Sequence, residues 1–481
     1  MSYLILLIIF TLFFTTPAVS QDPTFSWGKK IERDARKLGN IKIVGANEDG
    51  CFATYEVNRQ VTLEHYNHLS QTFWTTALLP KTPEGEPATF HSVQMYQGSL
   101  YMISSSSGKD RISVYAQEIN HNGNYLADRK LIAEGKDDKT IEIATAPNDA
   151  ALLIVTSGNH KSPITLTLLS SRLNKRWTHT LTSGGEVQEA LVQPDGTSYL
   201  LTKATAAAPS TTAFYLYQLN ARTGSHTELV LGHTDYRPLR AKLAAGTNGS
   251  VFVAGYMSPS SSVASLQPEP IGTFIYRIDR QRIQKPFIAY TPFNSAFVQT
   301  YKRFKPDFDN SQRLRHLRLD KVLSAADGSI ILLGEVCNSE NGAGFVQHHN
   351  NDIVVVRLQK DGTPIYTTSV NKLQSGTNAR NTIRSYFATV IQNSLKIIYL
   401  DFEYDHSISY TESNADAGLK APVLVTINSE GDQKKKVLDN TNIGQKHNFF
   451  LRPDSAFRTS HTNFTIIGIG PDYYKYGVIR F

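Results

Sequence analysis

Short apolar runs that follow a turn-forming pair recur along all 481 residues of the chain. The clearest copies are SIILLG after Asp327-Gly328 and SVFVAG after Asn248-Gly249. Further copies follow Asp49-Gly50, Gln97-Gly98, Asn148-Asp149 and Asp195-Gly196, and less regular ones follow Asn393-Ser394 and Thr462-Asn463. About eight units result, spaced by roughly 50 residues early in the chain and roughly 65–80 later, within or just beyond the range of propeller blades.

Each unit holds two predicted hairpins. An Asn-Gly or Asp-Gly pair between β-rich runs is a strong hairpin signal, and we expect type I′ turns with positive φ at two successive residues. The return strand of the second hairpin often carries an aromatic residue followed by threonine, as in FWTTAL (73–78), RWTHTL (176–181) and PIYTTS (364–369). Four antiparallel strands per unit predict an all-β propeller of about eight blades, with seven as the alternative.

The Asp-Gly pairs are interpreted as hairpin corners rather than ligand-binding loops. A calcium loop needs several oxygen ligands at alternate positions and a bidentate acid at its end. These turns carry too few acidic residues for such a loop. We therefore expect them to be architectural.

The last unit ends on YKYGVIRF at Phe481, which matches the third strand of a blade and leaves the fourth missing. Near the other end, TFSWGKKI (24–31) places Phe25 and Trp27 on one face of a strand. We predict that residues 21–40 are an N-terminal arm whose strand 24–31 completes the last blade of a propeller over 41–481. A frayed arm, or a short helix from Ile31 to Leu38, is the alternative.

The repeat resembles that of secreted bacterial β-propellers of the quinoprotein-like kind. The segments DGSIILLG (327–334), DIVVVRLQKDG (352–362) and PIYTT (364–368) carry this resemblance. It implies the fold and no reaction, because the Trp-docking motifs and vicinal cysteines of quinone-cofactor dehydrogenases are absent. We expect no cofactor.

The chain opens with an apolar run of roughly a dozen residues, too short to span a bilayer comfortably. Small residues follow at Ala18-Val19-Ser20, so residues 1–20 are predicted to be a signal peptide of a secreted or periplasmic protein without a membrane span. The net charge of +7 is dilute and forms no stripe with aromatic residues, which argues against nucleic acid as a partner.

Two cysteines, Cys51 and Cys337, fall in units one and six. A disulfide needs Cα atoms within about 7 Å of each other, and these blades would not be neighbours in a ring of eight. We predict two free, buried thiols.

Long connections gather in units five to seven, where loops on one face of a rigid scaffold are typical binding sites. They cover residues 257–272, 293–313, 337–351 and 403–421. The connection from unit five to six holds the basic and aromatic residues Tyr301, Lys302, Arg303, Phe304, Lys305 and Phe308. Such side chains stack on sugars and pair with acids, so we predict a binding surface here; an ordinary solvated loop is the alternative.

The same sector holds His348, His349, Glu403, Asp405 and His406. Such residues can ligate a divalent metal or supply an acid and a base for glycoside chemistry. They lack the spacing of a known metal site, and adjacent histidines point apart in a strand, so we expect no metal. Asp405, His406 and His348 are the catalytic candidates.

No nucleophile motif is present, so we expect a non-enzymatic, monomeric exported propeller that binds a protein or glycan through the loops of units five to seven. The first alternative is a propeller enzyme acting on polysaccharide. The second is an outer-membrane β-barrel, because the alternation in YKYGVIRF leads to a terminal aromatic residue.

Overall fold

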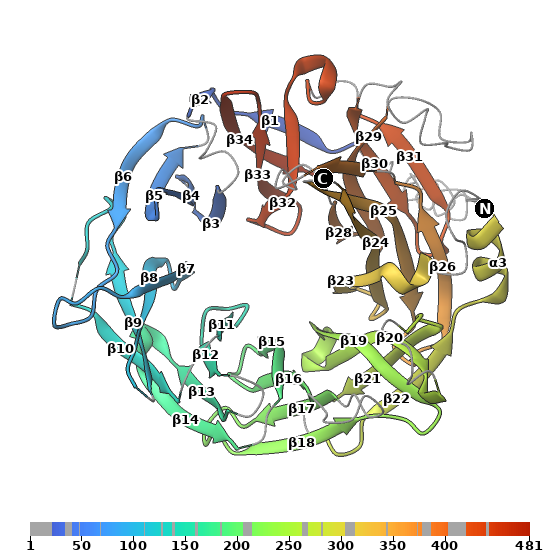
Figure 1. The fold of residues 1–481 in the computed structure, drawn as a ribbon, viewed down its shortest axis with the longest axis horizontal. Helices are drawn as coiled ribbons and strands as arrows, with labels where there is room; N and C mark the ends of the chain where they lie inside the picture. The colour runs from blue at the N-terminus through green and yellow to red at the C-terminus, as the bar shows by residue number, and fades with distance from the viewer. Residues whose placement is uncertain are drawn as a thin grey trace, which may run out of the picture.

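The computed structural model describes residues 22–481 apart from 34–40, 48, 68, 110, 127, 137–139, 159–161, 183–184, 205–213, 262–267, 280–281, 304–312, 343–344, 373, 378–385, 403–419 and 439–441. These described residues form eight separate antiparallel sheets arranged as blades around a ring (Figure 1). The prediction of an eight-bladed propeller is confirmed. The alternative of an outer-membrane β-barrel is wrong, because a barrel is one closed sheet and these strands divide into eight separate sheets.

Blades 1 to 4 follow one another along the chain, each with its first strand at the inside of the ring (Figure 1). Blade 1 contains β3 (Lys42–Asn47), β4 (Gly50–Val57), β5 (Gln60–Asn67) and β6 (Thr72–Leu78). Blade 2 contains β7 (Thr89–Tyr96), β8 (Ser99–Ser107), β9 (Ile112–Ile119) and β10 (Lys130–Gly135). Blade 3 contains β11 (Thr140–Thr145), β12 (Leu152–Ser157), β13 (Ile164–Leu169) and β14 (Lys175–Leu181). Blade 4 contains β15 (Glu186–Val192), β16 (Ser198–Lys203), β17 (Phe214–Leu219) and β18 (His226–Leu231).

Blades 5 to 8 complete the ring. Blade 5 contains β19 (Tyr236–Ala245), β20 (Val251–Pro259), β21 (Gly272–Ile278) and β22 (Phe287–Pro292), and helix α3 (Ser295–Arg303) follows it. Blade 6 contains β23 (Leu317–Ser324), β24 (Ile330–Gly342), β25 (Phe345–Leu358) and β26 (Pro364–Val370), with β27 (Gln374–Thr377) added beside β25. Blade 7 contains β28 (Phe387–Ile391), β29 (Ser394–Phe402), β30 (Lys420–Ile427) and β31 (Gln433–Val437). Blade 8 contains β32 (Phe450–Arg458), β33 (Asn463–Ile469), β34 (Tyr473–Arg480) and, from the other end of the chain, β1 (Thr24–Trp27) with β2 (Ile31–Glu32).

The closing strand is confirmed. β1 pairs antiparallel with β34, with Thr24 opposite Arg480 and Trp27 opposite Gly477, and β2 continues along the same edge. The indole of Trp27 meets the ring of Phe449 edge-on, with centroids 4.9 Å apart. The ring is therefore closed by hydrogen bonds between the two ends of the described chain, which leaves no open blade edge at the seam.

A buried polar network next to the seam links blade 8 to blade 1. Arg33 donates to Oε1 of Glu64 at 2.6 Å, and the Tyr55 hydroxyl donates to the same oxygen at 2.9 Å. The hydroxyls of Tyr66 and Tyr474, from blades 1 and 8, lie 2.8 Å apart. Because Glu64 is buried, removal of Arg33 would leave a buried carboxylate without its positive partner.

The Asp-Gly pairs are hairpin corners, but their turn type differs from the prediction. In the turns of blades 4 and 6 the glycine has positive φ and the aspartate does not. The aspartate instead accepts a hydrogen bond from the backbone N–H two residues on: Asp195 from Thr197, Asp327 from Ser329 and Asp361 from Thr363. These are type I turns closed by one left-handed glycine, and the carboxylates are used within the turns.

Aromatic residues on outer strands dock on a glycine of the next blade. The pairs are Trp74 with Gly123, Trp177 with Gly224 and Tyr366 with Gly431. A Cβ atom on Gly224 would lie 2.7 Å from Cδ2 of Trp177, and the indole donates to the Ala221 carbonyl at 3.2 Å. The aromatic-threonine pattern of the sequence therefore serves contacts between blades.

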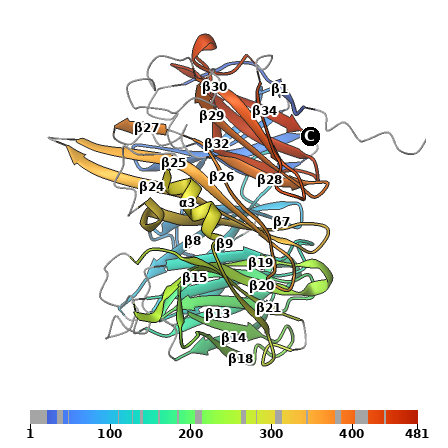
Figure 2. The same cartoon turned by 90° about the vertical axis from the view of Figure 1, so that its right-hand side faces the viewer.

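The segment 337–351, predicted as a loop, instead prolongs two strands. Cys337 pairs with Asn350 and Gly342 with Phe345, so β24 and β25 form a long hairpin, and β27 pairs along β25. Figure 2 shows this hairpin and β27 projecting beyond the ring on one side. Backbone pairing on both sides of β25 makes the segment extended in spite of its polar composition.

Both thiols are free, as predicted. Cys51 is buried, whereas Cys337 is half-buried, and its thiol donates to the Glu335 carboxylate at 3.1 Å. The expectation of two buried thiols is therefore wrong for Cys337, because the projecting hairpin carries it to the edge of the ring.

Candidate functional site

Helix α3 is inserted between the outer strands of blades 5 and 6. The side chain of Asn294 accepts a hydrogen bond from the N–H of Ala296 at 2.8 Å, which caps the helix where the chain leaves β22. Apolar residues then recur at helical spacing, and Phe297 and Val298 pack against the core between the two blades. The connection 293–313, expected as a loop, therefore begins with a helix.

Aromatic rings attach α3 to the ring of blades. Phe297 stacks on Tyr301, with centroids 5.6 Å apart and planes at 21°, and meets Phe293 edge-on at 5.9 Å. Phe293 in turn meets Tyr256 of β20 at 6.2 Å. These contacts attach α3 to blade 5, and the same face of the helix borders β26.

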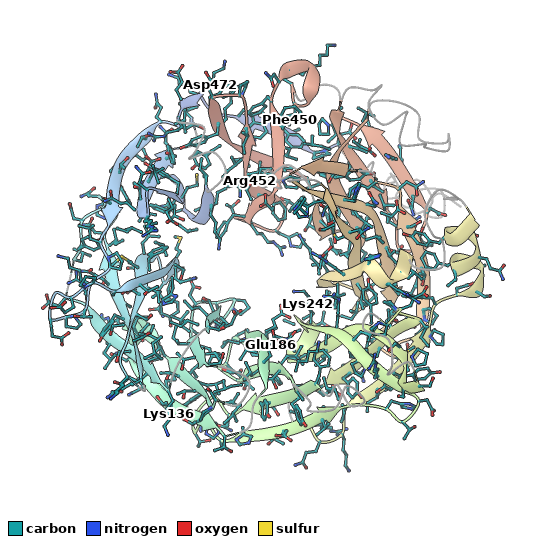
Figure 3. The ribbon with its side chains drawn as sticks, in the orientation of Figure 1. Lys136, Glu186, Lys242, Phe450, Arg452 and Asp472 are labelled. Carbon is teal, nitrogen blue, oxygen red and sulfur yellow. The ribbon has the colours of Figure 1, made fainter. Side chains whose placement is uncertain are left out.

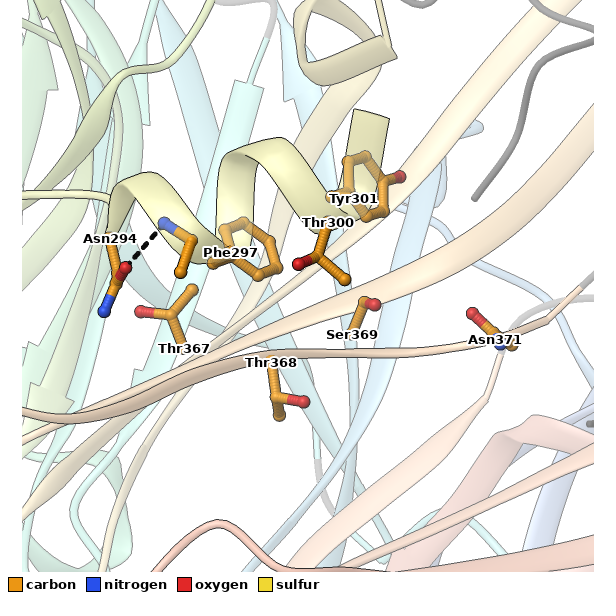
Figure 4. A pocket seen from close by; sticks show the side chains of 9 residues that line it. Asn294, Phe297, Thr300, Tyr301, Thr367, Thr368, Ser369 and Asn371 are labelled. Atoms are coloured by element: carbon orange, nitrogen blue, oxygen red, sulfur yellow. Dashed lines mark hydrogen bonds between the residues drawn. The ribbon is translucent and has the colours of Figure 1, made fainter. Parts of the chain in front are cut away.

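A groove of about 440 Å³ lies between α3 and β26 (Figure 4). Its lining residues are Asn294, Ala296, Phe297, Thr300, Tyr301, Thr367, Thr368, Ser369 and Asn371. These nine residues include no aspartate, glutamate, histidine, lysine or arginine. The groove thus offers aromatic surface, hydroxyls and amides without fixed charge.

The two faces of β26 contact different elements: one faces α3 and the other faces blade 7. In Figure 4, Thr367 and Ser369 point from β26 toward α3, whereas Thr368 points to the other side. There the Thr368 hydroxyl accepts a hydrogen bond from the Gln433 amide of blade 7. Within the described part of the chain, the hydroxyls of Thr300, Thr367 and Ser369 form no hydrogen bond, so they are available to a ligand.

The structure describes only three of the six residues predicted to bind a partner. Tyr301 lines the groove but is only 5% exposed. Lys302 and Arg303 are the last two residues of α3. Phe304, Lys305 and Phe308 lie outside the described residues.

Of the catalytic candidates, only His348 lies within the described residues. His348 and His349 are neighbours on β25, where His348 contacts the Ser339 hydroxyl at 2.8 Å and His349 is buried. Asp405, His406 and Glu403 lie outside the described residues.

Sequence reasoning missed the polar residues of the groove. The sequence predicts Thr367 and Ser369 only as part of a return strand, and Asn371 follows the predicted strand. Their alternation with Thr368 was the available signal, since it places two hydroxyls on the face away from the docked ring of Tyr366.

A buried ion pair anchors the projecting hairpin. The Lys372 ammonium donates to the Glu335 carboxylate, to the Asn350 carbonyl at 2.9 Å and to the Gln374 amide oxygen at 3.0 Å. Both charged residues are nearly inaccessible, with 2% and 3% exposure. This network joins β24, β25 and β27 at the base of the hairpin.

Asp320 lies next to this network on the innermost strand of blade 6. Its carboxylate accepts a hydrogen bond from the Tyr386 hydroxyl at 3.1 Å. Burial raises the pKa of Asp320 to about 6, and repulsion from Glu335 adds to the effect. A carboxyl with such a pKa can exchange protons near neutral pH.

Charged residues also line the middle of the ring, where Figure 3 shows Glu186, Lys242 and Arg452. On the wall formed by blades 3 to 5, the Glu189 carboxylate accepts the Leu243 N–H at 2.6 Å. Burial raises the pKa of Glu189, although Lys242 and this hydrogen bond oppose the rise. Among the described residues, no three histidines, cysteines or acids come close enough together to hold a metal ion.

None of the helices in the described part of the chain has the length and the apolar stretch needed to cross a bilayer.

No family model matches the chain, and no curated protein sequence matches it. Among solved structures, the chain is similar to one from a study of two prolyl endopeptidases, with 10% identity, a TM-score of 0.40 and coverage of 91% of this chain. This chain spans 55% of the length of that endopeptidase. It is also similar to a Lactobacillus plantarum protein at 12% identity and TM-score 0.36, over 84% of this chain and 96% of the other. The propeller domain of the Trilobed protease from Pyrococcus furiosus matches at 10% identity and TM-score 0.35, over 84% of this chain and 97% of that domain.

Proposed function

We propose that this chain is an exported, non-enzymatic propeller that binds a neutral glycan through the groove between α3 and β26. The observation that carries the proposal is the lining of the groove, which combines aromatic and hydroxyl groups and has no ionisable side chain other than Tyr301. Sugars are held by stacking on aromatic faces and by hydrogen bonds to hydroxyls and amides. A charged partner would find no opposite charge among these nine residues.

The lining also favours binding over hydrolysis. Glycoside cleavage usually requires two carboxyl groups across the scissile bond, and the nine described lining residues supply none. The rigid attachment of α3 through Phe293 and Tyr256 suits a preformed site, which loses little entropy when a ligand binds.

A glycan array probed with the full chain tests the proposal, followed by calorimetry with the best ligand. The variant Thr367→Val with Ser369→Ala should weaken binding by roughly 10-fold or more, since two hydrogen bonds of about 1 kcal/mol each are lost. The control is Thr178→Val with Thr180→Ala, which removes the hydroxyls at the equivalent positions of β14 on blade 3, where Thr178 contacts the Thr167 hydroxyl at 3.2 Å. Equal affinity in both variants would contradict the proposed site.

Asp320 supports a second candidate, a propeller enzyme acting on polysaccharide. Its pKa of about 6 suits a general acid, and it lies on a strand that lines the middle of the ring. A turnover screen with Asp320→Asn decides between the two. Turnover by the wild type that disappears in this variant favours the enzyme, whereas binding without turnover favours the groove.

A further inference from the structure

Two histidines meet on the outer circumference, where blade 3 contacts blade 4. Nε2 of His179 on β14 and Nδ1 of His226 on β18 share a hydrogen bond of 2.8 Å. Their ring centroids are 4.8 Å apart and their planes are inclined by 56°. The edges of the two imidazoles therefore point at one another across the interface.

The docking of the outer strands brings these histidines together. His179 stands two residues after Trp177, and His226 stands two residues after Gly224, on which Trp177 docks. The contact is thus fixed by the rigid frame of the ring, although 47 residues separate the two side chains in sequence.

The corresponding positions at other interfaces are filled by ordinary polar groups. Between blades 6 and 7, Thr368 and Gln433 stand two residues after Tyr366 and Gly431, and they share a hydrogen bond. Between blades 1 and 2, the Thr76 hydroxyl donates to the Gly123 carbonyl at 2.7 Å. Docking therefore does not require two imidazoles, although the hydrogen bond between them takes the place of the Thr368–Gln433 bond.

The separation of the two nitrogens fits neighbouring positions around a metal ion. Nitrogens bound at 2.0–2.1 Å and at a right angle to one another lie about 2.9 Å apart, against about 3.4 Å for a tetrahedral angle. The observed 2.8 Å matches the right angle, which is typical of the tetragonal sites of Cu²⁺ and Ni²⁺.

Solvent access also suits a metal. His226 is exposed on the outer strand, so solvent can reach the pair. Since no third histidine, cysteine or acid completes a group within the described residues, water would fill the remaining coordination positions.

We propose that His179 and His226 form a two-histidine site for a divalent transition metal, Cu²⁺ above all, which joins blade 3 to blade 4. Copper is favoured because nitrogen ligands bind it more tightly than other divalent first-row ions. This site is separate from the glycan groove, which lies between blades 5 and 6. Failure of one proposal leaves the other unaffected.

The test titrates the full-length protein with Cu²⁺ alone, followed by calorimetry and electron paramagnetic resonance. We expect one tight equivalent whose spectrum shows coupling to two nitrogens. The variant His179→Thr with His226→Gln reproduces the Thr368–Gln433 pair of blades 6 and 7, so it should fold. It should lose the tight Cu²⁺ equivalent, with binding weakened by roughly 100-fold or more, because both imidazoles of the chelate are lost.

Thermal unfolding supplies a second measurement. Excess Cu²⁺ should raise the unfolding midpoint of the wild type and leave that of the double variant unchanged, since the ion stabilises the state that binds it. Should the double variant fail to fold, His226→Gln alone changes an exposed side chain and carries the same expectation. Equal Cu²⁺ affinity in wild type and variant would assign the binding to other histidines and overturn the proposal.

Discussion

Blades 1 to 4 and blades 5 to 7 are built from the same four-stranded sheet, but they differ in what is added to it. In the first group the outer strands β6 and β14 dock by a tryptophan on a glycine of the next blade. In the second group β26 makes the same kind of contact through Tyr366, and α3, β27 and the extension of β24 and β25 are added around it. The comparison indicates that docking holds the ring, while the additions create surfaces that the ring does not need.

The largest expected effect tests how firmly the additions are anchored. Lys372→Met should lower the free energy of unfolding by about 3–5 kcal/mol, because Glu335 is left as a buried charge without its partner. Urea unfolding measures the loss. Adding Glu335→Gln to the same chain should restore most of it, since the unpaired charge is removed. A loss below about 1 kcal/mol would mean that the additions are only loosely attached.

The next effect tests the docking contact in the regular blades. Gly224→Ala should cost about 2–4 kcal/mol, because the new methyl group meets Trp177 and φ is +69°. Gly98→Ala is the control, since Gly98 has φ of +76° with no atom within 4 Å of an added Cβ. It should cost about 1–2 kcal/mol from backbone strain alone. Equal losses would show that docking adds nothing to stability.

A smaller effect concerns pH and the inner strand of blade 6. Asp320 has a pKa of about 6 in the folded chain, above its ordinary 3.8, so the folded state binds the proton more tightly. Its contribution therefore destabilises the fold as pH rises from about 4 to 6 and stays unfavourable above that range. Asp320→Asn should raise stability at pH 7.5 by on the order of 2 kcal/mol and leave it unchanged at pH 4. Unfolding curves at the two pH values check this, and a loss at pH 7.5 would contradict it.

The smallest expected effect on stability belongs to the groove itself. Thr367→Val with Ser369→Ala should change the free energy of unfolding by no more than about 0.5 kcal/mol, as expected for half-buried surface hydroxyls without partners in the described chain. Thermal unfolding measures it. A large loss would give these hydroxyls a structural role and weaken the contrast between frame and additions.

The frame was predictable because its signals are local. Turn pairs beside β-rich runs gave the blades, and Phe25 and Trp27 at period two gave the closing strand. Asn248 and Gly249 both have positive φ, as predicted. The turn type was mispredicted for the Asp-Gly pairs, because an Asp-Gly pair fits both a type I′ turn and a type I turn closed by a left-handed glycine. The aspartate side chain of Asp327, bonded to the backbone of Ser329, selects the second.

The candidate sites depend on contacts between distant residues, which no local pattern encodes. Thr367 and Ser369 line a groove only because α3 lies over β26. His179 and His226 are likewise adjacent because two blades dock. The anchoring of the hairpin by Lys372 is also not predictable from the sequence, because the polar segment 337–351 has the composition of a loop and is extended only through its pairing with β27.

Hydrogen exchange of the full chain with and without the best glycan from the array tests the central claim most directly. Our account predicts that the glycan slows exchange in 295–303 and 364–371, which form the groove, and leaves the equivalent outer strand 175–181 unchanged. Slowed exchange in 175–181 or around the middle of the ring, with none at α3 and β26, would contradict it.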